Sequence, residues 1–149
     1  MTKDEPTASP AKWVADQARL YEESGGTEGT TLQGSPCLLL DTQGRKSGQW
    51  RRTVLLYGRD GEDYLIVASQ GGADQHPSWY LNLTAHPGVG LRVGPERFTA
   101  QAETLSSEDK ARVWPHLLEV WPPYAEYQAK TKRDIPVVRL RRDRDSAGK

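Results

Sequence analysis

The chain has 149 residues, and its 20 lysines and arginines are balanced by 20 aspartates and glutamates, which gives a formal net charge of zero at pH 7. This length fits a single domain with its own core, and the neutral balance argues against a general nucleic-acid binder, which carries a basic excess. One cysteine excludes an internal disulfide framework, and the sequence has neither an apolar run long enough to span a bilayer nor a secretory signal, so we expect a cytoplasmic protein.

The first 27 residues are expected to form a polar N-terminus with one helix, set apart as residues 1–27. Residues 1–10 contain two prolines and few apolar side chains, which is typical of a loosely attached terminus. Within residues 11–23, Trp13 and Tyr21 lie at helical spacing with other apolar side chains, which predicts a short amphipathic helix.

The main domain is predicted over residues 28–141, followed by a disordered basic tail over residues 142–149. Three strands follow a connector rich in Gly, Ser and Thr. The first covers residues 36–42, and the second begins at Trp50 and ends in an Asp-Gly turn, which is a hairpin signal. The third covers residues 63–72 and runs into a double glycine.

The second half of the chain mixes helices with a further hairpin. A helix is predicted after Pro77, and residues 88–105 form a predicted hairpin across a Gly-Pro turn. Ser106 is the expected cap of the next helix, with Asp109 three residues later in the manner of a capping box. Pro115 is expected to kink or break that helix.

The chain closes with a helix that begins at Pro122 and Pro123 and with a strand over residues 135–141. Short antiparallel hairpins dominate, and strands do not alternate with crossover helices. This order predicts a mainly β (α+β) fold, a small closed or half-closed barrel with helices over its ends, and not a doubly wound parallel sheet.

The stretch GRKSGQWRR, residues 44–52, concentrates basic charge without any carboxylate. Its basic side chains are Arg45, Lys46, Arg51 and Arg52. Gly44 and Gly48 allow a tight reversal that exposes backbone N–H groups, and Ser47 adds a hydroxyl donor. The stretch therefore predicts either an anion-binding site or a solvated hairpin tip.

Two more stretches are candidate sites. In residues 68–82 a buried strand ends in Ser-Gln-Gly-Gly before a helix, an arrangement that holds phosphates or ring carbonyls when it is not simply a glycine-capped turn. Trp121, Tyr124 and Tyr127 form an aromatic stripe that either packs in a core or lines a pocket, where a phenol can donate to a substrate oxygen.

The remaining chemistry-bearing residues point to no protein-borne reactive group. The three histidines lie far apart in the sequence, so no metal site is expected. Cys37 lies in an apolar strand and is expected to be an inert core thiol, and no nucleophile elbow is present. If the chain is an enzyme, a bound cofactor is expected to supply the reactive atom.

Several of these motifs resemble, in order and spacing, the deazaflavin-dependent nitroreductase family of actinobacteria. They are GRKSGQWRR, RDG, IVASQGGADQHPSWYLNLTAHPGV and WPPYAEYQ. The resemblance implies a split β-barrel that binds coenzyme F420, an 8-hydroxy-5-deazaflavin with a phosphate and an oligoglutamate tail. It also implies an oxidoreductase that transfers hydride from C5 of the reduced cofactor to a quinone or nitro-compound acceptor.

The resemblance further implies the residues of the site. At the cofactor phosphate it places Arg45, Lys46 and Ser47, and toward the tail Arg51 and Arg52. Along the ring system it places Thr53, Val54, Leu55, Leu56, Val67, Ala68, Ser69, Gln70, Ser78, Trp79, Tyr80, Leu81 and Asn82. The implied catalytic residues, which hydrogen-bond the cofactor or the acceptor oxygen or line the acceptor pocket, are Tyr124, Ser69 and Tyr127.

The chain departs from the family pattern mainly on the expected acceptor side. Family members often have a proline in place of Trp50, a lysine in place of Gln70 and a tyrosine in place of Trp121. The basic turn is retained, so the departures concern the acceptor rather than the cofactor.

Three alternatives stay open. They are an FMN-dependent split-barrel oxidase of the pyridoxamine-phosphate-oxidase type, a non-catalytic deazaflavin carrier or sensor, and a basic-patch module for nucleic acid, which the neutral charge disfavours. The oligomeric state is also open, although homodimers are common among the related FMN proteins. The N-terminal helix is expected to be a soluble cap, with peripheral contact to the inner face of the membrane as the alternative.

Overall fold

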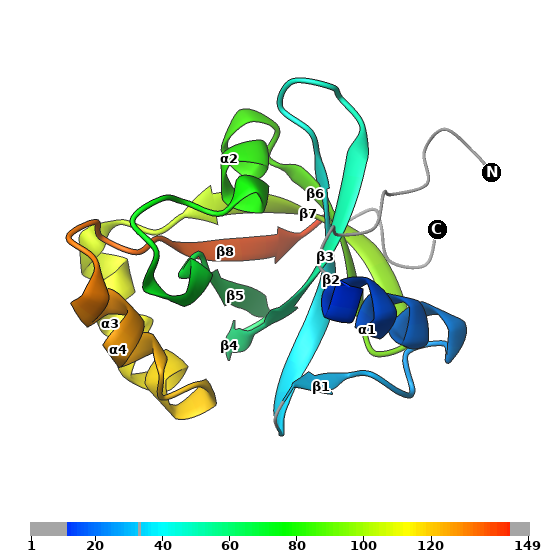
Figure 1. The fold of residues 1–149 in the computed structure, drawn as a ribbon, viewed down its shortest axis with the longest axis horizontal. Helices are drawn as coiled ribbons and strands as arrows, with labels where there is room; N and C mark the ends of the chain where they lie inside the picture. The colour runs from blue at the N-terminus through cyan, green and yellow to red at the C-terminus, as the bar shows by residue number, and fades with distance from the viewer. Residues whose placement is uncertain (1–11, 33, 144–149) are drawn as a thin grey trace.

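An antiparallel sheet curls into a half-barrel, and helices pack against its faces and its open side (Figure 1). The computed structural model describes residues 12–32 and 34–143, so the expectations for residues 1–10 and 144–149 lie outside the described residues. The elements are α1 (Lys12–Glu23), β1 (Thr31–Leu32), β2 (Ser35–Gln43), β3 (Trp50–Leu56), β4 (Gly58–Asp60), β5 (Asp63–Val67), η1 (Gln70–Gly72), α2 (Ser78–Ala85), β6 (Gly88–Val93), β7 (Glu96–Thr104), α3 (Ser107–Val120), α4 (Tyr124–Lys130) and β8 (Val137–Arg142).

The strand order explains where the barrel is open. The path runs β1-β2-β6-β7-β8-β5-β4, and β3 pairs with β2. Within the part of the chain that the structure describes, no ladder joins β3 to β5. The expected split barrel with helices over its ends is therefore confirmed, and its opening lies between these two strands.

The strands of the centre read as continuous apolar runs because both of their faces are buried. In β2, Leu38 and Leu40 face the barrel core, while Cys37 and Leu39 pack under α1. In β5 the same division sends alternate side chains to the barrel core and to a second core beneath α3 and α4. Three small cores thus meet at the central strands, and each helix is held by one of them.

Most of the predicted elements are found, with small shifts at their ends. The 88–105 hairpin and the helix after Pro77 are confirmed. β1, in the supposed connector, was not expected. The predicted second strand is divided at Tyr57 into β3 and β4, and the hairpin predicted at the Asp-Gly turn is confirmed as the pairing of β4 with β5. The third strand ends at Val67, five residues earlier than predicted, because the chain turns into η1.

Ser106 caps α3 as predicted, since its hydroxyl accepts a hydrogen bond of 3.1 Å from the backbone N–H of Asp109. The expected break at Pro115 is wrong, because α3 runs through it without interruption. An interior proline costs about 3 kcal/mol, whereas burial of Val113 and Leu117 in the core beneath α3 contributes about 1.5–3 kcal/mol each. Packing therefore offsets the lost hydrogen bond.

None of the helices in the described residues has the length and apolarity needed to cross a bilayer.

Candidate functional site

The basic stretch forms the tight tip of the β2–β3 hairpin. Gly44 N–H donates to Gln49 O at 2.8 Å, and Gly48 N–H donates to Gly44 O at 2.9 Å. A Cβ at Gly44 would lie 2.7 Å from Ser47 Oγ, and Gly48 has a φ of +72°. Both glycines are therefore required by the turn, as the sequence predicted.

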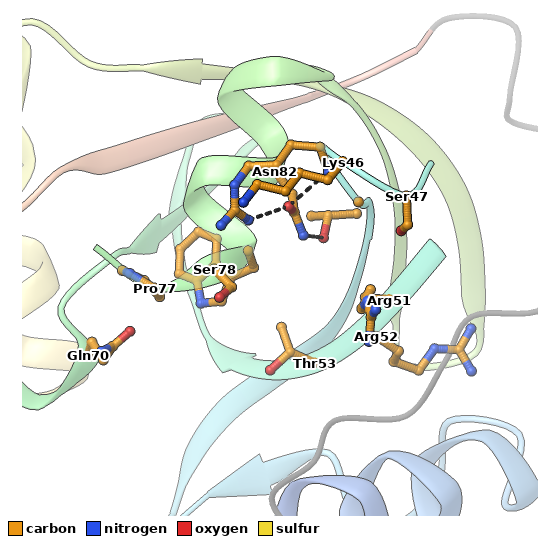
Figure 2. Close-up of a pocket in the computed structure, with 13 residues that line it drawn as sticks. Lys46, Ser47, Arg51, Arg52, Thr53, Gln70, Pro77, Ser78 and Asn82 are labelled. Atoms are coloured by element: carbon orange, nitrogen blue, oxygen red, sulfur yellow. Dashed lines mark hydrogen bonds between the residues drawn. The ribbon is translucent and has the colours of Figure 1, made fainter. Parts of the chain in front are cut away.

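Asn82 of α2 fastens this turn to the barrel. Its side-chain Oδ1 accepts hydrogen bonds from the backbone N–H of Arg45 at 3.2 Å and from Arg45 Nη1 at 2.9 Å (Figure 2). Its Nδ2 donates to Thr42 Oγ1 at 3.3 Å. Asn82 is only 5% exposed, so a buried amide holds the exposed basic turn in one orientation.

The turn forms one side of a cavity of about 530 Å³, which we call the basic half of the cleft (Figure 2). Its lining residues are Thr42, Gly44, Arg45, Lys46, Ser47, Arg51, Arg52, Thr53, Gln70, Pro77, Ser78, Trp79 and Asn82. Lys46 and Arg51 are exposed and form no ion pair with any residue that the structure describes. The cavity therefore offers uncompensated positive charge, which suits an anionic group.

Arg52 differs from its neighbours, because carboxylates already hold its guanidinium. It donates to Asp41 at 2.8 and 2.9 Å and lies 3.7 Å from Glu22 of α1. Burial raises the pKa of Asp41, which the hydrogen bonds from Arg52 oppose. The structure therefore places Arg52 beside the cavity, with the role of joining β3 to β2 and α1.

A second cavity, of about 620 Å³, continues from the first at Thr53, Gln70, Pro77 and Trp79. We call it the aromatic half of the cleft. It is lined by Trp13, Val14, Leu32, Thr53, Val54, Leu55, Leu56, Val67, Ser69, Gln70, Gly71, Pro77, Trp79, Trp121, Tyr124 and Tyr127. Because this cavity is lined by β3 and by the end of β5, the candidate site lies at the opening of the barrel.

Tyr124 belongs both to a core and to this cavity, so both readings of the aromatic stripe hold. The residue is 5% exposed and packs with the core beneath α3 and α4. Its hydroxyl has no hydrogen-bond partner among the described residues. Burial, and then the neighbouring Tyr127, raise the pKa of Tyr124 well above its ordinary value, so the phenol remains a proton donor at physiological pH.

The loop from Ser69 to Gly72 lines the aromatic half with Ser69, Gln70 and Gly71, and Gln70 also lines the basic half. Gln70 lies in the left-handed region with a φ of +45°, which is unfavourable for a residue other than glycine. Gly72 has a φ of +86°, and a Cβ there would lie 2.8 Å from Tyr127 O. The loop thus packs backbone to backbone against α4.

Three of the residues that were expected to lie along the cofactor ring are not part of the lining of either half of the cleft. Ala68 is fully buried behind the loop. Tyr80 turns to other partners, with its hydroxyl 3.0 Å from Thr104 Oγ1 and its ring against His76. Leu81, the third, lies on the same helix as Tyr80 and lines neither cavity. The other seventeen expected site residues line one half of the cleft or both.

Sequence reasoning missed several lining residues, above all Trp13 and Pro77. Trp13 was assigned to a capping helix, and nothing in the local sequence indicates that α1 reaches a cavity between β3 and β5. Its exposure of 58% is the observation that singles it out once the structure is known. Pro77 was interpreted only as a helix start, yet it lines both halves.

Comparison with known proteins finds one family. The family model described as F420H2-dependent quinone reductase matches residues 13–142. An F420H2-dependent quinone reductase of Mycobacterium tuberculosis is 45% identical over 127 residues, which are 83% of this chain and 85% of that protein.

Two solved structures are similar over most of the fold. One, described as a domain-swapped dimer, is 39% identical with a TM-score of 0.69 and covers 89% of this chain and 99% of its own. The other, an F420-H2 dependent reductase, is 40% identical with a TM-score of 0.66 and covers 70% of this chain and 93% of its own.

Proposed function

Because the chain belongs to the F420H2-dependent quinone reductase family, we propose that it is an oxidoreductase that passes hydride from reduced coenzyme F420 to a quinone. The observation that supports this most is the continuity of the two halves of the cleft. A cofactor that joins an anionic tail to a planar ring needs a charged region that runs into an apolar one. Reduction of nitro compounds stays a prediction.

The residues present fit such a cofactor. Lys46 and Arg51, with the backbone N–H groups of the turn, would hold the phosphate and the carboxylate tail. Thr53 to Leu56, on the strand edge without a ladder partner toward β5, and Trp79 on the facing wall would hold the ring. When bound, the reduced deazaflavin supplies a hydride from C5.

The chain's own contribution is position, exclusion of water and one proton donor. The aromatic half is walled by apolar and aromatic side chains, which exclude water from the ring and the acceptor. Tyr124 would donate a hydrogen bond to a quinone oxygen that gains negative charge, because its phenol keeps its proton and has no hydrogen-bond partner among the residues that the structure describes. Ser69 and Tyr127 would complete the polar contacts of this half.

Two measurements test this proposal together. Fluorescence titration with oxidised coenzyme F420, run beside FMN at matched salt, should show saturable binding of the deazaflavin alone. Oxidation of F420H2 by a soluble naphthoquinone should then proceed with turnover. Binding of FMN instead would assign the chain to the oxidase alternative, and deazaflavin binding without turnover would assign it to the carrier alternative.

A homodimer is also part of the proposal, since a structural relative of 39% identity is described as a domain-swapped dimer. Light scattering on the purified chain would measure the mass directly. A monomer at the concentrations used for turnover would contradict a dimeric active form.

Contact with the inner face of the membrane is proposed for α1 of a cytoplasmic protein. Trp13 and Leu20 are the large apolar side chains that α1 exposes, at 58% and 45%, and Trp13 borders the aromatic half. Co-sedimentation with anionic lipid vesicles, compared between the wild type and a Trp13→Ala, Leu20→Ala variant, would test it. Equal sedimentation of both would rule out this contact.

A further inference from the structure

Arg133, between α4 and β8, holds the loop of residues 68–76 by hydrogen bonds from its guanidinium. Its Nε donates to Ala73 O at 2.7 Å, its Nη2 to Ser69 O at 2.8 Å, and its Nη1 to Ala68 O and His76 Nδ1, both at 3.1 Å. Four of the five guanidinium N–H groups thus donate to one loop, which lines the aromatic half with Ser69, Gln70 and Gly71 and the basic half with Gln70.

The guanidinium of Arg133 has no carboxylate within ion-pair distance among the described residues, and the charge of Asp74 acts on it from farther away. All four hydrogen bonds end on uncharged acceptors, and the guanidinium forms no ion pair with the described residues. Other partly buried arginines behave differently: Arg92 is held by Glu22, and Arg139 by Asp60. A half-buried cation that binds three backbone oxygens and a histidine nitrogen, without an ion pair, is costly to bury.

The direction of the peptide groups shows where that field acts. In a trans peptide the C=O and the following N–H point in opposite directions. Because the carbonyls of Ala68 and Ser69 point at Arg133, the N–H groups of Ser69 and Gln70 point away from it. Neither N–H donates to an acceptor within the described part of the chain, and both residues line the aromatic half.

The strained backbone of Gln70 is a second observation that supports a functional role for this loop. Gln70 has a φ of +45°, and Gly71 and Gly72 after it also have positive φ values, but only Gln70 carries a side chain that makes this conformation unfavourable. Such strain persists only where the surroundings enforce it. Here Arg133 fixes the peptide before Gln70, and Ala73 N–H, which donates to Gln70 O at 3.1 Å, fixes the peptide after it.

We propose that Arg133 is a positioning residue that aims and polarises the Ser69 and Gln70 N–H groups as a donor pair for a carbonyl oxygen bound in the cleft. Hydrogen bonding of a cation to the far side of a peptide group strengthens its N–H as a donor. A preorganised donor pair stabilises an oxygen on which negative charge develops. The oxygen is carried by the cofactor ring or by the quinone; the inference rests on the proposed function.

Two variants of Arg133 distinguish a residue that positions the two N–H groups from one that only stabilises the fold. Arg133→Lys keeps the charge but cannot reach three carbonyls at once, and Arg133→Gly leaves a space that free guanidinium can refill. Arg112→Lys is the matched control, because Arg112 is an exposed arginine of α3 that pairs with Asp60 of β4 and lines neither half of the cleft. For each protein we would measure the melting temperature, the Kd of oxidised F420, and kcat and KM for a soluble naphthoquinone.

Arg133→Lys should change either the Kd of F420 or kcat by about tenfold to 100-fold. Removal of a single preorganised donor costs about 100-fold or more, and this variant weakens the positioning of two donors without removing either. Loss in the Kd of F420 assigns the oxygen to the cofactor, and loss in kcat with an unchanged Kd assigns it to the quinone. Guanidinium, but not the same concentration of sodium chloride, should restore the Arg133→Gly protein.

A fall in melting temperature with unchanged Kd, kcat and KM would overturn the inference and leave Arg133 a structural residue. Absence of both F420 binding and turnover in the wild type would instead overturn the proposed function, so the two failures are distinguishable.

Discussion

The two halves of the cleft are built in opposite ways. The basic half is carried by one exposed hairpin tip, whose cations Lys46 and Arg51 lie within six residues of the sequence and belong to none of the three cores. The aromatic half is assembled from α1, β3, β5, the η1 loop and α4, and its residue Tyr124 is itself part of a core. Charge can therefore be altered in the first half without disturbing the fold, whereas the second half is coupled to stability.

This contrast predicts how each half contributes to binding. Contacts between exposed cations and an anionic tail are screened by salt, and apolar walls around a ring are not. Cofactor affinity should accordingly depend on ionic strength through the basic half alone, and turnover should depend on the aromatic half.

The largest effect is expected for the double variant Lys46→Ala, Arg51→Ala. Each charge-assisted hydrogen bond contributes about 1.5–3 kcal/mol, so F420 affinity should fall by about 100-fold or more, with the melting temperature unchanged. Fluorescence titration at two salt concentrations checks this, and Arg112→Ala, which removes another exposed arginine, is the control. An unchanged affinity would show that the tail lies elsewhere.

Tyr124→Phe should have the next largest effect. Loss of a positioned proton donor lowers turnover by about 100-fold or more, while the Kd of F420 should change little, because the aromatic ring remains. Steady-state kinetics with a naphthoquinone measure kcat, and Tyr80→Phe, whose hydroxyl bonds to Thr104 outside the cleft, is the matched control. Equal kcat in the two variants would remove Tyr124 from the reaction.

Alanine substitutions at Gly71 and Gly72 test more finely how the aromatic half of the cleft is coupled to the free energy of unfolding. Gly71 and Gly72 have φ values of +63° and +86°, but an added Cβ meets nothing within 4 Å at Gly71 and lies 2.8 Å from Tyr127 O at Gly72. Gly71→Ala should cost about 1 kcal/mol from backbone strain alone. Gly72→Ala should cost more, because α4 must also shift.

Urea unfolding of the two alanine variants gives both free energies of unfolding. Equal losses would mean that the loop yields without moving α4. Since Tyr124 and Tyr127 lie on α4, Gly72→Ala should also lower kcat, whereas Gly71→Ala should affect it less.

The smallest effect concerns pH. Burial, followed by the charge of Arg133, lowers the pKa of His76 from its ordinary value of 6.5. The unfolded chain then binds a proton more readily than the folded one, so stability contributed by neutral His76 is lost as pH falls from about 6.5 through the folded pKa. The melting temperature should therefore decline slightly over this range, and His76→Gln should flatten the decline.

Sequence predicted the basic half well because local rules determine it. Two glycines, a cation cluster and the absence of acids lie within nine residues, and the turn that they predict is the turn observed. The buried apolar runs of β2 and β5 likewise indicated central strands correctly.

The aromatic half could not be predicted in the same way, because it depends on tertiary packing. Trp13 and Tyr124 are more than 100 residues apart, and only the folded barrel brings them to one cavity. Arg133 gave no signal, since its partners are backbone carbonyls that any sequence supplies. Pro115 was judged by its local cost, whereas burial of Val113 and Leu117 decided the outcome.

The way in which α1 is attached has a consequence for how this protein can diversify. Tyr21 accepts from Gly94 N–H at 2.6 Å and donates to Cys37 O at 3.2 Å, Glu22 binds Arg92 and Arg97, and Gln17 Nε2 donates to Gly29 O and Thr31 O at 2.8 Å. These polar anchors to the rest of the protein begin at Gln17 and leave the first turn of the helix out. Trp13, one wall of the cleft, lies at the other end. Substitutions in the first turn of α1 would change which acceptors enter the cleft without breaking the hydrogen bonds and ion pairs that hold the helix. The range of acceptors can therefore evolve at this turn separately from the use of the cofactor.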